Sequence, residues 1–495
     1  MTASPTTVVE LLRRTADAHA DRLAFVDGDR RMTFAGLERA AAGVAASFAD
    51  LGVGKGDVVC LMLPSSIDYA VCYHAAMRLG AVASGINLRL GPTEVDSIVG
   101  RTRPRVTVCD AGVTPPDGAG RVVSRADAVA AFDGPPLDHP PAVDASDPVT
   151  VVWTSGTTGR PKGAVFDHDN LAAMARGAYP ISQPGDVRLS PLPFAHVGFM
   201  TRAWDELANA ITTVIVPTPW KAGTALRLIQ DEGVTVGQGV PTQWSLMIAH
   251  PDVERTDRAS LRVCAIGGAS VAPELVRAMR RTFACPVVVR YASTEASIIS
   301  GTTIGEDDEI VARTVGTAVD GVEVEVVDDD GRRLPPGQVG RIRCRSAAVM
   351  RRYWDDPERT AEVLGADGRL TTGDLGWTDE RGNLTLVGRR AEMYIRGGYN
   401  VYPSEVEAVL SEHPCVARVA VVGIPDTVLG ERGAAFVVPE PGGALDADDL
   451  RHWCRARLAD YKAPDVVRIV DDLHLTSMLK VDKRALVDLV EQEVT

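Results

Sequence analysis

The chain has 495 residues, of which 45% are hydrophobic and 24% charged, and its formal net charge is −14. This composition is typical of a protein with a large buried core, and the length predicts about two to four domains. The acidic balance excludes nucleic acid and anionic membranes as default partners, because both would repel most of the surface. An acidic substrate must therefore be met by local positive charge.

The first residues lack a basic segment followed by a long apolar run, and they predict an amphipathic helix that begins near Val8. No stretch reaches the roughly 18 apolar residues that a membrane-spanning helix needs. The eight cysteines are scattered without the close spacing of a zinc site. We therefore expect buried, reduced thiols and a cytoplasmic protein.

Helical and β-branched segments alternate from about Thr33 to Val108, which is typical of an α/β fold. The stretch 110–148 is rich in Pro, Gly and Asp and predicts a surface connection. A strand at 149–153 follows it. A second α/β series then runs from Asn170 to about Ser300.

The pattern changes to a period of two at 322–327 and 341–345, which predicts an antiparallel hairpin. A compact unit begins after Arg389, with Ser404 expected as the N-cap of its first helix. We therefore predict an α/β protein in two parts. Residues 1–390 form a large N-terminal domain of packed α/β subdomains plus a β-barrel-like part, and residues 391–495 form a small, mobile α+β domain.

The strand at 149–153 leads into a segment with the composition of a polyphosphate-binding loop: Thr154, Ser155, Gly156, Thr157, Thr158, Gly159, Arg160, Pro161, Lys162 and Gly163. Glycines let backbone amides approach an anion, hydroxyls donate to phosphate oxygens, and the two cations supply charge. It is not a Walker A loop, because Pro161 and Gly163 stand where that motif needs Gly and Ser or Thr. The alternative is a flexible surface turn, which this composition after a buried strand disfavours.

This segment resembles the signature loop of the acyl-adenylate-forming superfamily, which includes acyl- and aryl-CoA synthetases, luciferases and peptide-synthetase adenylation domains. The resemblance covers nearly the whole chain, and the later motifs occur in the family's order. It implies an enzyme that uses ATP and Mg²⁺ to convert a carboxylic acid into an acyl-adenylate. The acyl group then passes to coenzyme A, with release of AMP and pyrophosphate.

The segment from Tyr291 to Glu295, YASTE, is similar to the family's YGxTE motif. The resemblance implies that Tyr291 packs on adenine, that Thr294 contacts the α-phosphate region and that Glu295 helps to hold Mg²⁺. Taken alone, the segment favours a strand end followed by a helix cap at Ser293 or Thr294.

The segment TGD at 372–374 is similar to the family motif in which the carboxylate, here Asp374, binds both ribose hydroxyls. By the same resemblance, Arg389 reaches the ribose or phosphate. Gly267, Gly268 and Ala269 follow a strand and correspond to a glycine-rich wall against adenine. Taken separately, each of these features is typical of an ordinary turn or surface residue. Only their order along the chain favours a role in nucleotide binding.

Near the C-terminus, Lys480 aligns with the family's catalytic lysine, which bridges the substrate carboxylate and the α-phosphate. His196 matches a position beside the reacting carboxylate, and a hydrogen-bonded core histidine is an equal alternative. Phe199, Met200 and Trp204 suggest an apolar or aromatic substrate tail, although plain core residues have the same pattern. Arg202 is a solvated arginine or a partner for a second acidic group.

The segment 396–403 resembles a strand that lines the pantetheine tunnel of the CoA-forming branch. Gly397 would leave that tunnel open because it has no Cβ, and an ordinary β-turn is the alternative. Three positions depart from the family pattern: Ala292 replaces Gly, Ala391 occupies the hinge position usually held by Asp or Lys, and Leu479 replaces the Gly that commonly precedes the catalytic lysine. Rival hypotheses are an enzyme that passes the acid, or nitrite, to an amine, carrier protein or other nucleophile, and a catalytically dead ligand-binding relative.

Overall fold

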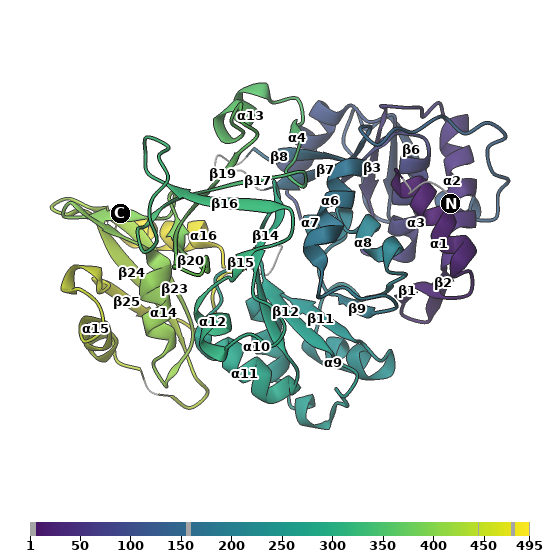
Figure 1. Cartoon of the computed structure of the whole chain (residues 1–495). Coiled ribbons are helices and arrows are strands. Elements are labelled where there is room, and N and C mark those ends of the chain that lie inside the picture. Colours follow the sequence, from purple (N-terminus) through teal and green to yellow (C-terminus); the bar gives the residue numbers. More distant parts are fainter. Residues whose placement is uncertain (1–5, 155–159, 444, 477–480, 495) are drawn as a thin grey trace.

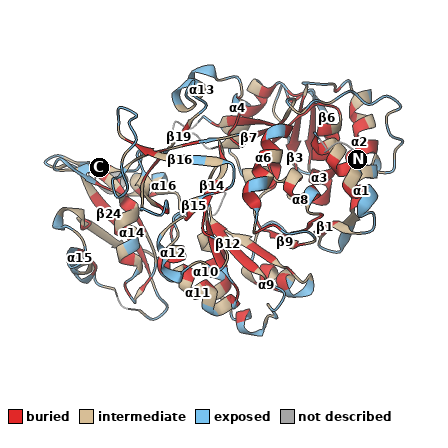
Figure 2. Ribbon diagram, viewed as in Figure 1, coloured by how far each residue is buried: buried red, intermediate tan, exposed pale blue. Residues whose placement is uncertain are grey.

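The computed structural model describes residues 6–154, 160–443, 445–476 and 481–494. Four β-sheets organise this part of the chain (Figure 1). The N-terminal helices lie at one end of the molecule and the C-terminal sheet at the other (Figure 1). The strands at the centre of each sheet are mostly buried, and the exposed residues gather on loops and outer helix faces (Figure 2).

The first sheet is parallel apart from two antiparallel strands at one edge. Its interior strand β3 is buried at every position, because its side chains enter two separate apolar clusters on the two faces. In spatial order the strands are β18 (Arg352–Tyr353), β8 (Lys162–Asp167), β7 (Pro148–Thr154), β4 (Val82–Gly85), β3 (Val58–Met62), β5 (Val106–Cys109) and β6 (Arg121–Ser124).

The second sheet has nine strands and two differently covered faces. Helices α9 to α12 contribute to the apolar cluster on one face, and α6 contacts both β8 and β14 and so links the two sheets. In spatial order the strands are β15 (Thr317–Ala318), β14 (Ser297–Gly301), β13 (Val287–Ser293), β12 (Val263–Gly267), β11 (Val236–Gly239), β9 (Val187–Ser190), β10 (Thr212–Ile215), β1 (Leu23–Asp27) and β2 (Arg30–Thr33).

The third sheet is the predicted antiparallel part, and the fourth belongs to the C-terminal unit. The third contains β16 (Val322–Val327), β17 (Gly340–Ser346), β19 (Leu370–Thr378) and β20 (Leu384–Arg389). The fourth contains β22 (Tyr399–Val401), β21 (Tyr394–Arg396), β24 (Gly430–Pro439), β23 (Val416–Asp426) and β25 (Val466–Ile469). Sheet membership therefore changes between Arg389 and Tyr394, and the domain boundary near residue 390 stays a prediction.

Helix starts follow local capping chemistry. The Thr7 side chain accepts a hydrogen bond from the Glu10 N–H at the start of α1, and Pro273 occupies the first turn of α11. The helices are α1 (Val8–Ala18), α2 (Phe34–Asp50), α3 (Ile67–Arg78), α4 (Pro92–Thr102), α5 (Arg125–Ala130), α6 (His168–Ala178), α7 (Val197–Met200), α8 (Ala203–Ala208), α9 (Ala222–Asp231), α10 (Pro241–Ile248), α11 (Pro273–Phe283), α12 (Asp308–Arg313), α13 (Pro357–Val363), α14 (Pro403–Ser411), α15 (Ala447–Arg455) and α16 (Lys483–Val494).

Two local predictions are wrong. The stretch 110–148 is not only a connection, because it contains the edge strand β6 and the short helix α5. The N-cap of α14 is Tyr402 rather than Ser404, since Pro403 already occupies the first turn. The Ser404 hydroxyl instead donates to the Val387 carbonyl.

The predicted fold class is confirmed: a large region of α/β subdomains and antiparallel sheet precedes a small α+β unit. All eight cysteines are free thiols, and seven of them are buried. Within the described ranges, no helix combines the length and apolar character that crossing a bilayer would require.

Candidate active site

The predicted phosphate loop joins two antiparallel strands. Thr154 ends β7 and Lys162 begins β8, and the two residues are paired across the sheet. Ser155, Gly156, Thr157, Thr158 and Gly159 lie outside the described residues. Gly163 has a packing role, since a Cβ there would lie 2.6 Å from Val151 and 2.9 Å from the Trp153 ring. Packing alone therefore explains why position 163 is glycine, and an anion-binding role is not needed to explain it.

The YASTE segment forms a tight strand-to-strand connection. β13 ends at Ser293 and the antiparallel β14 begins at Ser297, so the helix-cap alternative is wrong. The Ser293 hydroxyl oxygen instead accepts a hydrogen bond of 3.1 Å from the Ala296 N–H. Thr294 and Glu295 are consequently presented at the tip of a hairpin, where both are half-buried.

A polar cluster, in which Tyr291 and Asp374 are buried, links this hairpin to the third sheet. The Tyr291 hydroxyl donates to Asp374 Oδ2 at 2.5 Å, and Arg389 Nε lies 3.2 Å from Asp374 Oδ1. Burial raises the pKa of the Asp374 carboxyl, although Arg389 opposes the shift. Burial and the adjacent Asp374 also raise the pKa of Tyr291. The arrangement positions a carboxylate that can accept hydrogen bonds from a diol after exchanging its present partners.

A second cluster links the same hairpin to the phosphate loop. The Tyr353 hydroxyl donates to Glu295 Oε1 at 2.7 Å, and the Lys162 ammonium lies 5.2 Å from the centre of the Tyr353 ring. Tyr353 is held beside β8 by the short strand β18, where it pairs with Ala164. The sequence analysis missed Tyr353, because a two-residue strand in an arginine-rich segment has no recognisable pattern.

The predicted glycine-rich wall, Gly267 to Ala269, lies at the end of β12. A Cβ on Gly267 would lie 2.3 Å from the Arg290 carbonyl oxygen, and Gly268 has a φ of +80°. Glycine is therefore needed at both positions for the backbone itself. Gly268 and Ala269 are exposed, as a surface that receives a flat ligand would be.

His196 is not a core histidine. It is half-buried at the N-cap of α7, where its Nδ1 accepts a hydrogen bond of 3.2 Å from the Gly198 N–H. Phe199 and Met200 are buried in the core, and the Phe199 ring stacks on Phe194 with their centroids 3.5 Å apart. These two residues therefore carry no argument for an aromatic substrate tail.

The remaining candidates lie in the C-terminal unit. Gly397 and Gly398 form the turn between β21 and β22, with φ of +56° and +88°. This is the β-turn alternative, and the pantetheine role of Gly397 stays a prediction. Lys480 lies outside the described residues, whereas Leu475 and Val481 on either side of that segment are paired as an antiparallel bridge.

Comparison with known proteins agrees with this geometry. The family model for AMP-binding enzymes matches residues 12–354, and the model for the AMP-binding enzyme C-terminal domain matches residues 405–480. The 3-[(3aS,4S,7aS)-7a-methyl-1,5-dioxo-octahydro-1H-inden-4-yl]propanoyl:CoA ligase of Rhodococcus jostii is 33% identical, with 98% of this chain and 99% of that protein covered. A feruloyl-CoA synthase of an Amycolatopsis species is 35% identical, with coverage of 92% and 93%.

A solved structure, ATP-bound MatB from Rhodopseudomonas palustris, superposes with a TM-score of 0.88 at 30% identity, covering 98% of this chain and all of that one. The fold is thus that of adenylate-forming enzymes. The chain belongs to the AMP-binding enzyme family, as its signature loop suggested. It is a carboxylic acid–CoA ligase, which confirms the predicted reaction.

Proposed function

We propose that this ligase binds ATP across the β13–β14 hairpin and joins the acid to the nucleotide there. The observation that carries the proposal is the position of this hairpin between two polar clusters. Tyr291 contacts Asp374 and Arg389 from the third sheet, and Glu295 contacts Tyr353 beside Lys162 of the phosphate loop. Base, sugar and phosphate ends of one nucleotide would each meet suitable groups.

In this proposal Asp374 binds the ribose hydroxyls, with Arg389 close by, and Tyr291 lies against the adenine beside Gly267, Gly268 and Ala269. The phosphate chain is held by the loop from Thr154 to Lys162. Thr294 donates to the α-phosphate region. Support comes from the buried Asp374 and from the cation beside the hairpin tip.

Mg²⁺ fits the phosphate end of this site. Glu295 supplies a carboxylate oxygen, the ligand type that Mg²⁺ prefers, and phosphate oxygens and water complete such a shell. Tyr353 orients that carboxylate through its 2.7 Å hydrogen bond. When bound, the ion would neutralise phosphate charge as pyrophosphate leaves.

The chemistry has two steps. A carboxylate oxygen of the acid attacks the α-phosphorus, the bond to the pyrophosphate oxygen breaks, and an acyl-adenylate forms. The CoA thiol, after losing its proton, then attacks the acyl carbonyl and AMP leaves. We assign Lys480 to the first step, where its ammonium stabilises charge on the two reacting anions, and His196 to the border of the acid. Gly397 is assigned to the thiol path of the second step, and the reaction to the cytoplasm, where thiols stay reduced.

A panel of carboxylic acids with ATP, with and without CoA, tests the overall proposal through AMP and acyl-CoA formation. CoA-dependent release of AMP without any thioester product would contradict the second step. No AMP or pyrophosphate with any acid would contradict the first.

Lys480→Ala tests the assignment of the lysine. We expect pyrophosphate exchange to fall by about 100-fold or more, because a charge that stabilises the transition state is lost. Thioester formation from supplied acyl-adenylate should survive, since that step does not use this ammonium. Lys221→Ala, on the N-cap of α9, is the matched control. Near-wild-type exchange in Lys480→Ala would remove Lys480 from the mechanism.

A further inference from the structure

Three arginines converge on the face of the nine-stranded sheet opposite helices α9 to α12. Arg188 on β9 shares this face with Val236, its partner on β11, and the face continues across paired strands to Gly267 and Arg290. Arg202 reaches the same region from the N-cap of α8. The sequence analysis left Arg202 open and did not single out Arg290.

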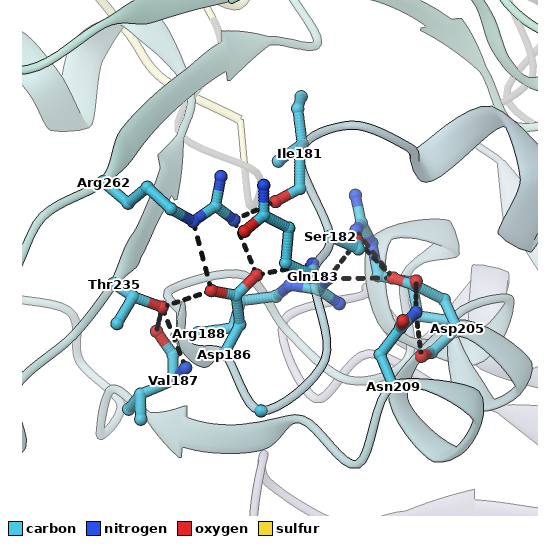
Figure 3. A network of polar contacts seen from close by, with 12 residues as sticks. Ile181, Ser182, Gln183, Asp186, Val187, Arg188, Asp205, Asn209, Thr235 and Arg262 are labelled. Atoms are coloured by element: carbon cyan, nitrogen blue, oxygen red, sulfur yellow. Dashed lines mark hydrogen bonds and ion pairs between the residues drawn. The ribbon is translucent and has the colours of Figure 1, made fainter.

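Arg188 is neutralised within the protein. Its Nη2 lies 2.8 Å from Asp205 Oδ2 and donates to the Ser182 hydroxyl at 2.6 Å, and Asp205 also accepts from Ser182 and Asn209 (Figure 3). The neighbouring Arg262 has its own carboxylate, Asp186, at 2.7 Å (Figure 3). Each arginine in this network therefore has a close acidic partner.

Arg290 has no such partner. Its Nε and Nη2 are buried and make no hydrogen bond to any described residue, and no carboxylate within the described ranges lies within ion-pair distance. The side chain lies across Gly301 of β14, where a Cβ would be 2.2 Å from Arg290 Nη1. Glycine at 301 thus makes room for a guanidinium whose charge the described residues leave uncompensated.

Arg202 is only weakly compensated. Its nearest carboxylate oxygen, Asp205 Oδ2, is 4.0 Å away and is already committed to Arg188. Burial lowers the pKa of Arg202 to about 10, and burial together with Arg202 lowers that of Arg290 to about 10. Both side chains therefore remain cationic at neutral pH. Glu206, the other acid in the cluster, has a pKa raised by burial to about 7, so it is only partly charged there.

Both arginines lie next in the chain to elements of the proposed site. Arg290 immediately precedes Tyr291, and Arg202 follows the short helix α7 that begins after His196. Alternation along β13 directs the Tyr291 and Arg290 side chains to opposite faces of the sheet. Two guanidinium groups offer many donors in planar forks that match a carboxylate.

We propose that Arg202 and Arg290 bind a second carboxylate at the distal end of the substrate, so that the preferred acid is a dicarboxylate. This inference rests on the proposed function, because it assumes that the first carboxylate is the one activated. The two arginines are specificity-determining residues. The bound carboxylate supplies the counter-charge that the cluster lacks.

The test compares saturated dicarboxylates from malonate to suberate with their monomethyl esters and with monocarboxylates of equal length, by kcat/KM for pyrophosphate release. The wild-type enzyme should prefer a dicarboxylate over its own monoester by about 10- to 100-fold, the effect of losing charge-assisted hydrogen bonds. Arg290→Met and Arg202→Met should each remove most of that preference by raising KM for the dicarboxylate. Turnover of monocarboxylates should change by less than about threefold.

Controls separate recognition from folding. Arg290→Lys keeps the charge and should retain part of the preference, and Arg255→Met, at an 85% exposed side chain, should leave all values unchanged. Equal use of diacid and monoester by the wild type, or an equal loss for every acid in Arg290→Met, would overturn the inference. Failure of all acids to release pyrophosphate would instead refute the proposed function.

Discussion

At the scale of single residues, the burial of Glu206 beside the arginine cluster makes the stability of the protein depend on pH. Burial raises the pKa of this carboxyl from 4.5 to about 7, against the attraction of Arg188 and Arg202. The folded protein therefore binds the proton more tightly than the unfolded chain. The protonated Glu206 carboxyl therefore makes its full contribution to the free energy of unfolding below pH 4.5. This contribution is lost as the pH rises through about 7.

Glu206→Gln should remove this pH dependence. Between pH 4.5 and 8, the free energy of unfolding of the variant relative to wild type should shift in the variant's favour by about 2–3 kcal/mol. Urea unfolding at both pH values measures the shift, with Glu254→Gln, at an exposed position of the 3-10 helix Val253–Arg255, as control. A constant difference across this range would show that Glu206 ionises normally in the folded protein.

The sequence alone predicted some residues of the candidate site and missed others, and the difference has a physical reason. Tyr291 and Asp374 were named from motifs, and the structure joins them by a hydrogen bond across 83 positions of sequence. Tyr353 and Arg290 were not named, because their partners are far away in sequence or absent. A lone tyrosine or arginine is informative only when its surroundings are known.

At the scale of elements, the glycine turn between β21 and β22 allows two effects to be separated. Gly397 and Gly398 both have positive φ, so alanine at either position strains the backbone by about 1–2 kcal/mol. A Cβ on Gly397 would contact Leu429 at 3.5 Å, whereas a Cβ on Gly398 would meet no atom within 4 Å. Both substitutions therefore fit sterically in this conformation.

Gly397→Ala should reduce acyl-CoA formation by about 10-fold or more, because a side chain would narrow the proposed thiol path, and should leave pyrophosphate exchange nearly unchanged. Gly398→Ala carries comparable backbone strain and serves as the matched control. Parallel assays of pyrophosphate exchange and of thioester formation distinguish the two variants. Equal effects of the two variants on thioester formation would attribute the loss to strain alone.

Helices and strands with a clear hydrophobic period were predicted close to their observed bounds, whereas the short elements β6 and α5 were missed. The alternating strand β16 (Val322–Val327) was located at its exact bounds. β6 was missed because three of its four residues are exposed, so it lacks the apolar pattern of a core strand. Helix α5 has six residues, too few to show a helical period.

At the scale of the whole molecule, the two parts of the chain meet at a short connection that contains Ala391. It lies in the turn between β20, which carries Arg389, and β21 of the C-terminal sheet. The Glu392 and Met393 N–H groups both donate to the Arg389 carbonyl, and among the described backbone bonds none starts from the Ala391 N–H. Proline at 391 would therefore break no described hydrogen bond while fixing φ.

Ala391→Pro should lower overall acyl-CoA turnover by about 10-fold or more, if the two half-reactions need different backbone angles at this position. At least one half-reaction, assayed alone, should stay close to the wild-type rate. Ala391→Gly keeps the connection free and should preserve turnover. Unchanged overall turnover in Ala391→Pro would show that the backbone angle at position 391 does not have to change between the two half-reactions.

The β13–β14 hairpin has one further consequence, for how this enzyme can diversify. Successive residues of β13 face opposite sides, so in our proposal position 290 faces the substrate tail and position 291 contacts the nucleotide. A change at 290 should therefore alter the accepted acid without disturbing the proposed nucleotide contact one residue away. Libraries randomised at 202, 290 and 301 should therefore yield new acid preferences at little cost in ATP use.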